Sequence, residues 1–209
     1  MNHRNLGLVL LLVLVPACGG AGARVATGPT GPLTAAILHP LGEGYIWTYD
    51  IDTQTGITTL AIRRVLRAEP PRFVLRADGE REEHTYEVRD GGLWDATDGV
   101  WVLREPIALD TTWPSRGGRT ARISAVEQEV DVGAGHFTRC VEVSETGAET
   151  GPDLRTVYCP EQGPVIIESH QSLRLSARGG ITVRSELRAP LQRGMEDVEA
   201  PEEEAPPGR

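Results

Sequence analysis

Histidines beyond the amino-terminal segment are the residues of this 209-residue chain that are best suited to acid–base chemistry or metal binding. They are His39, His84, His136 and His170, and none stands at metal-ligand spacing from another histidine or a cysteine. The motifs H-E-x-x-H, C-x-x-C and G-x-S-x-G do not occur, and Ser-x-x-Lys cannot occur because the chain has no lysine. We therefore expect no catalytic residue, no metal ligand and no cofactor.

Two aspartates in the segment DATDG, Asp95 and Asp98, invite comparison with a calcium-binding loop. The segment lacks the number of oxygen ligands that such a loop supplies. A turn between the apolar segments GLW and VWVL explains it better. The glycine pairs at 117–118 and 179–180 likewise favour hairpin turns over phosphate-binding loops.

Cys140 and Cys159 flank the segment TGAETGPD, whose glycine and proline content is typical of a hairpin loop. A hairpin centred between positions 149 and 150 sets Val141 against Tyr158, and the two cysteines then meet on the face opposite the core. At such a pair of opposed positions we predict a disulfide. The alternative is a register shifted by one residue, which would place the two thiols on opposite faces.

Aromatic residues of the first two thirds of the expected domain have two interpretations. They fill a solid core, because aromatic side chains bury large areas, or they line an apolar ligand cavity inside a curved sheet. The residues concerned are Trp47, Tyr49, Tyr86, Trp94, Trp101 and Trp113.

The elements that must position these residues are short, rich in β-branched and aromatic side chains, and separated by turn residues. This pattern predicts a single antiparallel all-β domain, with a strongly curved sheet (a half-barrel) or a sandwich. At most one short helix is expected, and residues 33–38 are its best candidate. The expected strands cover 45–52, 57–68, 72–78, 81–89, 92–96, 100–105, 120–127, 128–132, 136–145, 154–160, 164–169, 171–177 and 181–189.

A weak internal repeat links PLGEGYIW at 40–47 to PIALDTTW at 106–113. Each segment places a tryptophan seven positions after a proline. We interpret it as two halves of one sheet that begin in the same way, with the tryptophan closing one end of the core. Chance similarity is the alternative.

The amino terminus carries Arg4 and then an apolar run at 6–15, which is about half as long as a membrane-spanning helix. Its length is typical of a signal peptide. Val15-Pro16-Ala17-Cys18 resembles the lipobox of bacterial lipoproteins. The resemblance implies removal of residues 1–17, lipidation of Cys18 and a lipid-anchored place in the cell envelope, and Gly19 favours the outer membrane of a two-membrane bacterium. The alternative is an ordinary secretory signal that is cut after a site such as Ala21-Gly22-Ala23.

The amino-acid composition divides the rest of the chain into three segments. Residues 18–36 read as a flexible tether, 37–190 as the β domain, and 191–209 as an acidic, proline-rich, disordered tail. The formal net charge of −9 argues against nucleic-acid partners and against electrostatic attraction to anionic lipid. We therefore expect contact with the membrane through the amino-terminal lipid, and any protein or lipid partner of the domain stays undefined.

Several of these residues also resemble a family of uncharacterised bacterial envelope lipoproteins. The shared features are the opening P-L-x-x-G-x-x-W-x-Y, here at 40–49, and a later A-G-x-F-x-x-C-x-x-V segment at 134–143 that is followed by Tyr158 and Gly163. The resemblance implies a β-rich envelope domain with no assigned reaction. Some such domains are similar to the half-barrel of periplasmic lipoprotein carriers.

Three classes of function remain open from the sequence. The first is a non-enzymatic interaction or structural module at the membrane, and the second is a carrier of a lipid or other apolar ligand in a half-barrel. The third is a hydrolase of unrecognised type, which needs a serine–histidine or histidine–acid pair that spacing alone does not reveal. An enclosed cavity would favour the second class over the first.

Overall fold

The computed structural model describes residues 30–53, 57–79, 81–147, 151–172 and 180–194, and the strands in them form one antiparallel sheet of twelve. The sheet order is β6-β5-β4-β3-β2-β1-β12-β11-β10-β9-β8-β7. The elements are α1 (Ala35–Leu38), β1 (Ile46–Asp52), β2 (Thr58–Glu69), β3 (Arg72–Ala77), β4 (His84–Arg89), β5 (Gly92–Asp95), β6 (Val100–Arg104), β7 (Thr112–Pro114), the 3-10 turn η1 (Arg116–Gly118), β8 (Thr120–Val132), β9 (Gly135–Thr146), β10 (Asp153–Cys159), β11 (Gly163–Ser172) and β12 (Gly180–Leu187). The antiparallel all-β class and the helix within residues 33–38 are confirmed.

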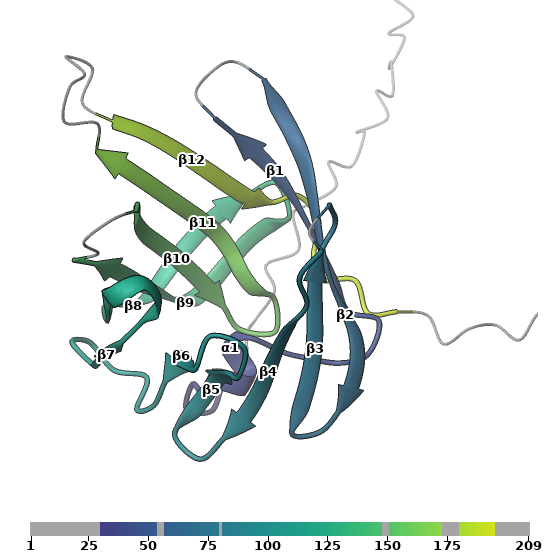
Figure 1. Cartoon of the computed structure of the whole chain (residues 1–209), viewed down its shortest axis with the longest axis vertical. Helices are drawn as coiled ribbons and strands as arrows, with labels where there is room; N and C mark the ends of the chain where they lie inside the picture. Colours follow the sequence, from purple (N-terminus) through teal and green to yellow (C-terminus); the bar gives the residue numbers. More distant parts are fainter. Residues whose placement is uncertain (1–29, 54–56, 80, 148–150, 173–179, 195–209) are drawn as a thin grey trace, which may run out of the picture.

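The sheet consists of two consecutive meanders, β1 to β6 and β7 to β12. They are joined where β1 pairs with β12, with Tyr49 opposite Leu187. The sheet curls until its two end strands approach each other, so that the shape is a nearly closed barrel (Figure 1). At this seam the indole nitrogen of Trp113 in β7 donates to the carbonyl of Trp101 in β6 over 3.0 Å. The curvature therefore goes further than the half-barrel expected from the sequence.

The repeated tryptophans open the two meanders in the same way, as the sequence predicted. Trp47 in β1 and Trp113 in β7 are both buried, and each indole donates to a backbone carbonyl of a distant strand or turn. The acceptor of Trp47 is Gln162, at 2.6 Å. Next to it, Gly163 has a φ of +85°, and a Cβ there would lie 2.8 Å from the indole nitrogen, so glycine is required.

Helix α1 closes one end of the barrel. Thr34 caps it by accepting from the amide of Ile37, and Ala35 and Leu38 are buried. The amide of Ala35 also donates to the Glu105 carboxylate over 2.9 Å, because the first amides of a helix lack internal partners. These contacts tie the segment before β1 to the end of β6.

The long hairpin of β8 and β9 bends back over the outside of the sheet. Glu127 and Arg139 have positive φ values of 53° and 59°, and the β8–β9 register shifts around them. At the tip, the amide of Ala134 donates to the carbonyl of Leu187 at the end of β12 over 2.9 Å. The hairpin thus lies behind β10 and β11 in the view of Figure 1 and adds a second layer there. The expected strands at 120–127 and 128–132 are one strand because a bulge, not a turn, separates them.

The disulfide between Cys140 and Cys159 is present, with a Cα–Cα distance of 4.2 Å. Val141 pairs with Tyr158 as the predicted register requires, although the centre of the loop lies outside the described residues. The two cysteines point away from Tyr158, yet both are fully buried. Their burial follows from the second layer, which the sequence did not reveal.

The folded body includes residues that the sequence-based boundaries of 37 and 190 left outside. Ala35 is buried in the core, and Ile46 forms a bridge with Gln192. Residues 1–29 and 195–209, with Cys18 and most of the expected tether and tail, lie outside the described part of the chain. Within that part, no helix has the length and apolar character needed to cross a bilayer.

Candidate functional site

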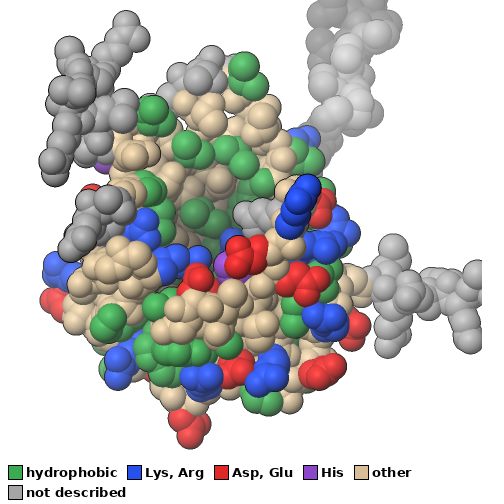
Figure 2. Space-filling model, in the orientation of Figure 1, with side chains coloured by type: hydrophobic (Ala, Val, Ile, Leu, Met, Phe, Trp, Pro, Cys, Tyr) green, Lys and Arg blue, Asp and Glu red, His purple; other side chains and the backbone are tan. Residues whose placement is uncertain are grey.

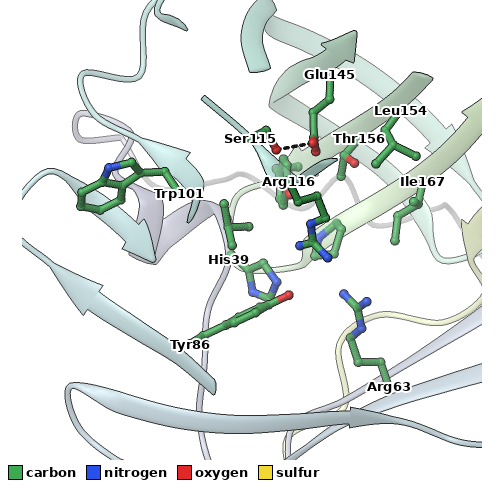
Figure 3. A pocket seen from close by; sticks show the side chains of 13 residues that line it. His39, Arg63, Tyr86, Trp101, Ser115, Arg116, Glu145, Leu154, Thr156 and Ile167 are labelled. Carbon is green, nitrogen blue, oxygen red and sulfur yellow. Dashed lines mark hydrogen bonds between the residues drawn. The ribbon is translucent and has the colours of Figure 1, made fainter. Parts of the chain in front are cut away.

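A cavity of about 180 Å³ lies inside the barrel, between the two meanders (Figure 3). Residues from both meanders and from the segment after α1 line it, so the cavity exists only when the sheet has closed. Its lining combines polar and apolar side chains: His39, Arg63, Tyr86, Trp101, Val102, Ser115, Arg116, Glu145, Leu154, Thr156, Tyr158, Pro164 and Ile167.

Two arginines enter the cavity from opposite halves of the molecule. Arg63 lies in β2 opposite Trp47 of β1, so it shares the inward face with that buried tryptophan. Arg116 is the first residue of η1, directly after the short end strand β7. In Figure 3 both guanidinium groups point into the space between the halves. The side chain of Arg116 is 39% exposed, which connects the cavity with solvent.

Acidic residues surround Arg116 on its outer side. Its guanidinium lies 3.2 Å from the carboxylate of Asp98 and 3.6 Å from that of Asp95. Burial by itself lowers the pKa of Arg116, but Tyr86, Asp98, Asp95 and Glu145 together raise it above the ordinary value. Arg116 is therefore charged at every physiological pH.

His39 forms part of the cavity wall as a neutral residue. It is 2% exposed and packs against the rings of Trp47, Tyr86 and Tyr158, with ring centroids 5.4 to 6.0 Å apart. Burial, and then the positive charge of Arg63, lowers the pKa of His39 to about 3. A histidine with so low a pKa is a weak general base at neutral pH.

Ser115, Glu145 and Tyr158 are further polar residues of the cavity. Ser115 donates its hydroxyl to Glu145, and burial raises the pKa of Tyr158 so that its phenol stays protonated. The serine is bonded to a carboxylate and not to His39. This arrangement lacks the serine–histidine pair of a hydrolase, whereas two guanidinium groups and neutral donors suit the binding of an anion.

The aromatic residues singled out from the sequence divide between core and cavity. Trp47, Tyr49, Tyr86 and Trp113 belong to the buried core, and Tyr86 also lines the cavity. Trp101 lines it as well and meets Trp94 edge to face, with centroids 5.1 Å apart. The cavity lining is thus mixed and cationic, unlike the aromatic, apolar lining considered from the sequence.

Sequence reasoning missed Arg63, Arg116, Ser115 and Glu145, and it named His39 without placing it in a cavity. One signal was present for Arg63: it stands two positions before Val65, so strand alternation places both on the core face. No comparable signal marks Arg116, because β7 was not predicted and η1 follows it.

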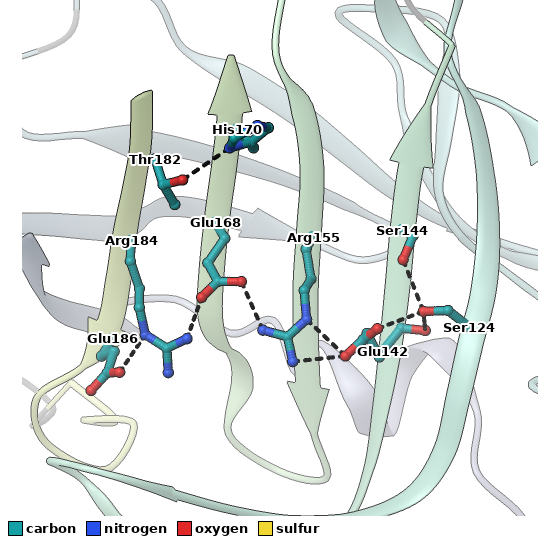
Figure 4. Close-up of polar contacts among 9 residues, drawn as sticks. All are labelled: Ser124, Glu142, Ser144, Arg155, Glu168, His170, Thr182, Arg184 and Glu186. Atoms are coloured by element: carbon teal, nitrogen blue, oxygen red, sulfur yellow. Dashed lines mark hydrogen bonds and ion pairs between the residues drawn. The ribbon is translucent and has the colours of Figure 1, made fainter. Parts of the chain in front are cut away.

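The outer face of strands β9 to β12 carries a second set of arginines and their acidic partners, which we call the outer ladder (Figure 4). Arg155 of β10 lies 2.7 Å from Glu142 and 2.8 Å from Glu168, and Arg184 of β12 pairs with Glu168 and Glu186. Each arginine thus stands between two carboxylates on neighbouring positions of the sheet. Although burial by itself raises the pKa of Glu168, hydrogen bonds from Arg155 and Arg184 lower it.

The surface of the molecule is hollowed between β11 and the pair β1 and β2 (Figure 2). Arginine and acidic side chains lie along the lower border of this hollow, and apolar side chains lie inside it. Leu154 and Ile167 give the cavity an apolar wall on the side of β10 and β11.

No protein-family model matches this chain, and no curated protein matches it either. Among solved structures, it is similar to a protein from Bacteroides fragilis NCTC 9343 that is inferred to be exported and has a YmcC-like fold. The sequence identity is 14%, the similarity covers 74% of this chain and 98% of that chain, and the TM-score is 0.47.

Proposed function

We propose that this protein is a lipid-anchored, non-enzymatic lipoprotein of the bacterial cell envelope whose barrel binds a small organic carboxylate. This proposal rests on one observation: the side chains of Arg63 and Arg116 both enter one cavity of the barrel. Arginine binds carboxylates through paired N–H groups and keeps its charge at every physiological pH. Among the described residues, Glu145 is the one acidic residue of the lining, and Ser115 donates to it, while Asp95 and Asp98 meet Arg116 outside the lining.

The volume of the cavity limits the size of the ligand. At about 180 Å³ it is smaller than the 300–1,000 Å³ or so that is usual for sites of drug-sized molecules. A small carboxylate would fit this volume, and so would the head group of a fatty acid whose chain extends along the apolar wall of Leu154 and Ile167. Both sources present the same carboxylate to the arginines.

The chemistry of the lining supports binding without catalysis. His39 is neutral and weakly basic, and Ser115 donates to Glu145. Membrane attachment is supported by the sequence alone, through the resemblance of residues 15–18 to a lipobox. With anchoring by acyl chains, the domain would present its cavity at a membrane surface.

A titration of the full-length chain in a non-ionic detergent tests the ligand class. We expect acetate, hexanoate or decanoate to change the tryptophan fluorescence, because Trp101 lines the cavity. Tightest binding of acetate would identify a small free carboxylate, and affinity that rises with chain length would identify a fatty acid. Inorganic phosphate serves as a competing anion.

Arg63→Gln should weaken carboxylate binding by about tenfold or more, the equivalent of about 1.4 kcal/mol. The matched control is Arg122→Gln, since Arg122 is exposed and pairs with Asp110 on the surface. Absence of binding by the wild type, or equal affinity of the wild type and Arg63→Gln, would overturn the proposal. The interaction-module alternative would then be the better description.

The anchor has a separate test. Cys18→Ser should abolish labelling of the protein by a radioactive fatty acid in a bacterial host and should stop cleavage before residue 18. Labelling that persists in this variant would contradict lipidation at Cys18.

A further inference from the structure

We infer that His84, Asp95 and Asp98 form a binding site for a divalent transition-metal ion of the Zn²⁺ type. The three residues come from the start of β4, the end of β5 and the turn that follows, and one ligand atom of each lies within 4.8 Å of the others. The site lies outside the lining of the cavity and does not depend on a carboxylate ligand there.

The buried carboxylate of Asp95 is the observation that points to a cation. Its side chain is fully buried, and one oxygen, Oδ1, accepts from the amides of Thr97 and Asp98. The other oxygen, Oδ2, accepts no hydrogen bond. A buried carboxylate oxygen without a donor is costly unless a positive charge compensates it.

The imidazole of His84 places a second potential ligand atom, Nδ1, close to Oδ2 of Asp95. Its Nδ1 is buried, has no hydrogen-bond partner and lies 3.5 Å from Oδ2 of Asp95. Zinc bonds of about 2.0–2.1 Å in a tetrahedron place two ligand atoms about 3.3–3.4 Å apart. The separation of the histidine and aspartate atoms therefore fits a shared metal ion.

Asp98 completes a set of three protein ligands. It lies in the exposed turn after β5, and one of its carboxylate oxygens is within 4.8 Å of the ligand atoms of His84 and Asp95. One imidazole and two carboxylates suit Zn²⁺ and related ions, and three protein ligands leave a fourth position open. Calcium is less well matched, because it prefers six or more oxygen ligands.

Arg116 competes with a metal ion for the carboxylates of Asp95 and Asp98. Its guanidinium lies beside Asp98 and Asp95, while Glu145 acts on it from the cavity side. Its distance of 3.6 Å from Oδ2 of Asp95 is beyond hydrogen-bonding range. A bound cation would repel this guanidinium toward Glu145, so the removal of Arg116 should strengthen metal binding.

Calorimetric titration of the full-length, histidine-tag-free chain with ZnCl₂ tests the site, after chelator has been removed. We expect one equivalent to bind, His84→Ala and Asp98→Asn to weaken binding by about tenfold or more, and Arg116→Gln to tighten it. His136→Ala is the control, because the pair of His136 and Asp131 on the surface offers the same residue types without a buried carboxylate.

A second measurement guards against variants that misfold. Zn²⁺ should raise the melting temperature of the wild type and leave that of His84→Ala unchanged. Circular dichroism without Zn²⁺ should show that both proteins are folded. No binding by the wild type, or equal affinity of the wild type and His84→Ala, would overturn the site. Carboxylate binding by His84→Ala should match the wild type, so failure here is distinct from failure of the proposed function.

Discussion

Arginine lies on both faces of this sheet, and the two sets meet different surroundings. In the outer ladder, Arg155 and Arg184 each stand between two carboxylates on the same surface. In the cavity, Arg63 and Arg116 share a lining that contains one acidic residue, Glu145. Arg116 also meets Asp98 and Asp95 on its outer side, so the two sets differ on the cavity-facing side of their guanidinium groups, where we propose that an anion binds. The difference teaches that the partners of a side chain, and not its type, separate scaffold from binding site.

If the outer side is scaffold, its covalent link should affect stability and not ligand binding. Replacement of both Cys140 and Cys159 by alanine should lower the free energy of unfolding by about 3 kcal/mol on the chain-entropy model. Urea denaturation of the full-length chain measures this loss. A reducing agent should destabilise the wild type equally and leave the double variant unaffected. A loss of carboxylate affinity in the double variant would break the comparison.

The cavity side should instead show a pH response through His39. Its pKa is about 3 in the folded protein and about 6.5 when unfolded, so the unfolded chain binds an extra proton between these values. Stability from this group is complete above pH 6.5 and is lost as the pH falls toward 3. Between pH 7 and pH 5 the loss should be about 2 kcal/mol.

Chemical denaturation at a series of pH values measures that slope. His39→Gln should flatten it, whatever its effect on the absolute stability. His170→Gln is the matched control, because His170 is exposed and bonded to Thr182 on the outside. A slope that persists in His39→Gln would show that another group is responsible.

The comparison is tested most directly by making the same arginine-to-glutamine substitution on each face of the sheet. Arg63→Gln should reduce carboxylate affinity by about tenfold, or about 1.4 kcal/mol, while Arg155→Gln should leave it unchanged. Fluorescence titration of both variants gives the answer. Equal losses would mean that the overall charge of the molecule, and not the cavity, attracts the anion.

The smallest effect is expected from the outer ladder itself. Glu168→Gln should cost about 1 kcal/mol or less of stability, because half-exposed ion pairs contribute little. Hydrogen bonds from Arg155 and Arg184 lower the pKa of Glu168, so its contribution should be lost only as the pH falls below the ordinary glutamate value. Urea denaturation at low and high salt measures the difference, which should shrink in salt. Glu129→Gln, at an exposed position of β8, is the control and should change neither value.

Much of the local structure followed from the sequence. Alternation and turn residues predicted nearly every strand, and the hairpin expected around residues 149–150 implied the register that pairs Val141 with Tyr158 and joins Cys140 to Cys159. These features depend on neighbours in sequence or on a single hairpin. Strand β7 was missed because three residues are too few to show a period.

The proposed metal site illustrates an arrangement that the local sequence pattern does not reveal. His84 and Asp95 stand eleven positions apart and were interpreted separately, as a strand residue and a turn residue. The pairing of β4 with β5 sets Tyr86 opposite Asp95, and this register brings the ring of His84 to the buried carboxylate. Spacing in the sequence predicts a metal site only when the ligands share a motif, and here a sheet register replaces the motif.

By itself, the sequence determined the β class, the hairpins, the disulfide and the two tryptophans that open the meanders, because each depends on alternation, turn chemistry or a short loop. The tertiary structure alone decided that β6 and β7 meet, that the β8–β9 hairpin folds over the disulfide, and that Arg63 and Arg116 face one cavity. Those outcomes follow from the total curvature of the sheet, which accumulates over all its strands. A cavity between residues 63 and 116 exists only after the two ends of the sheet have come together.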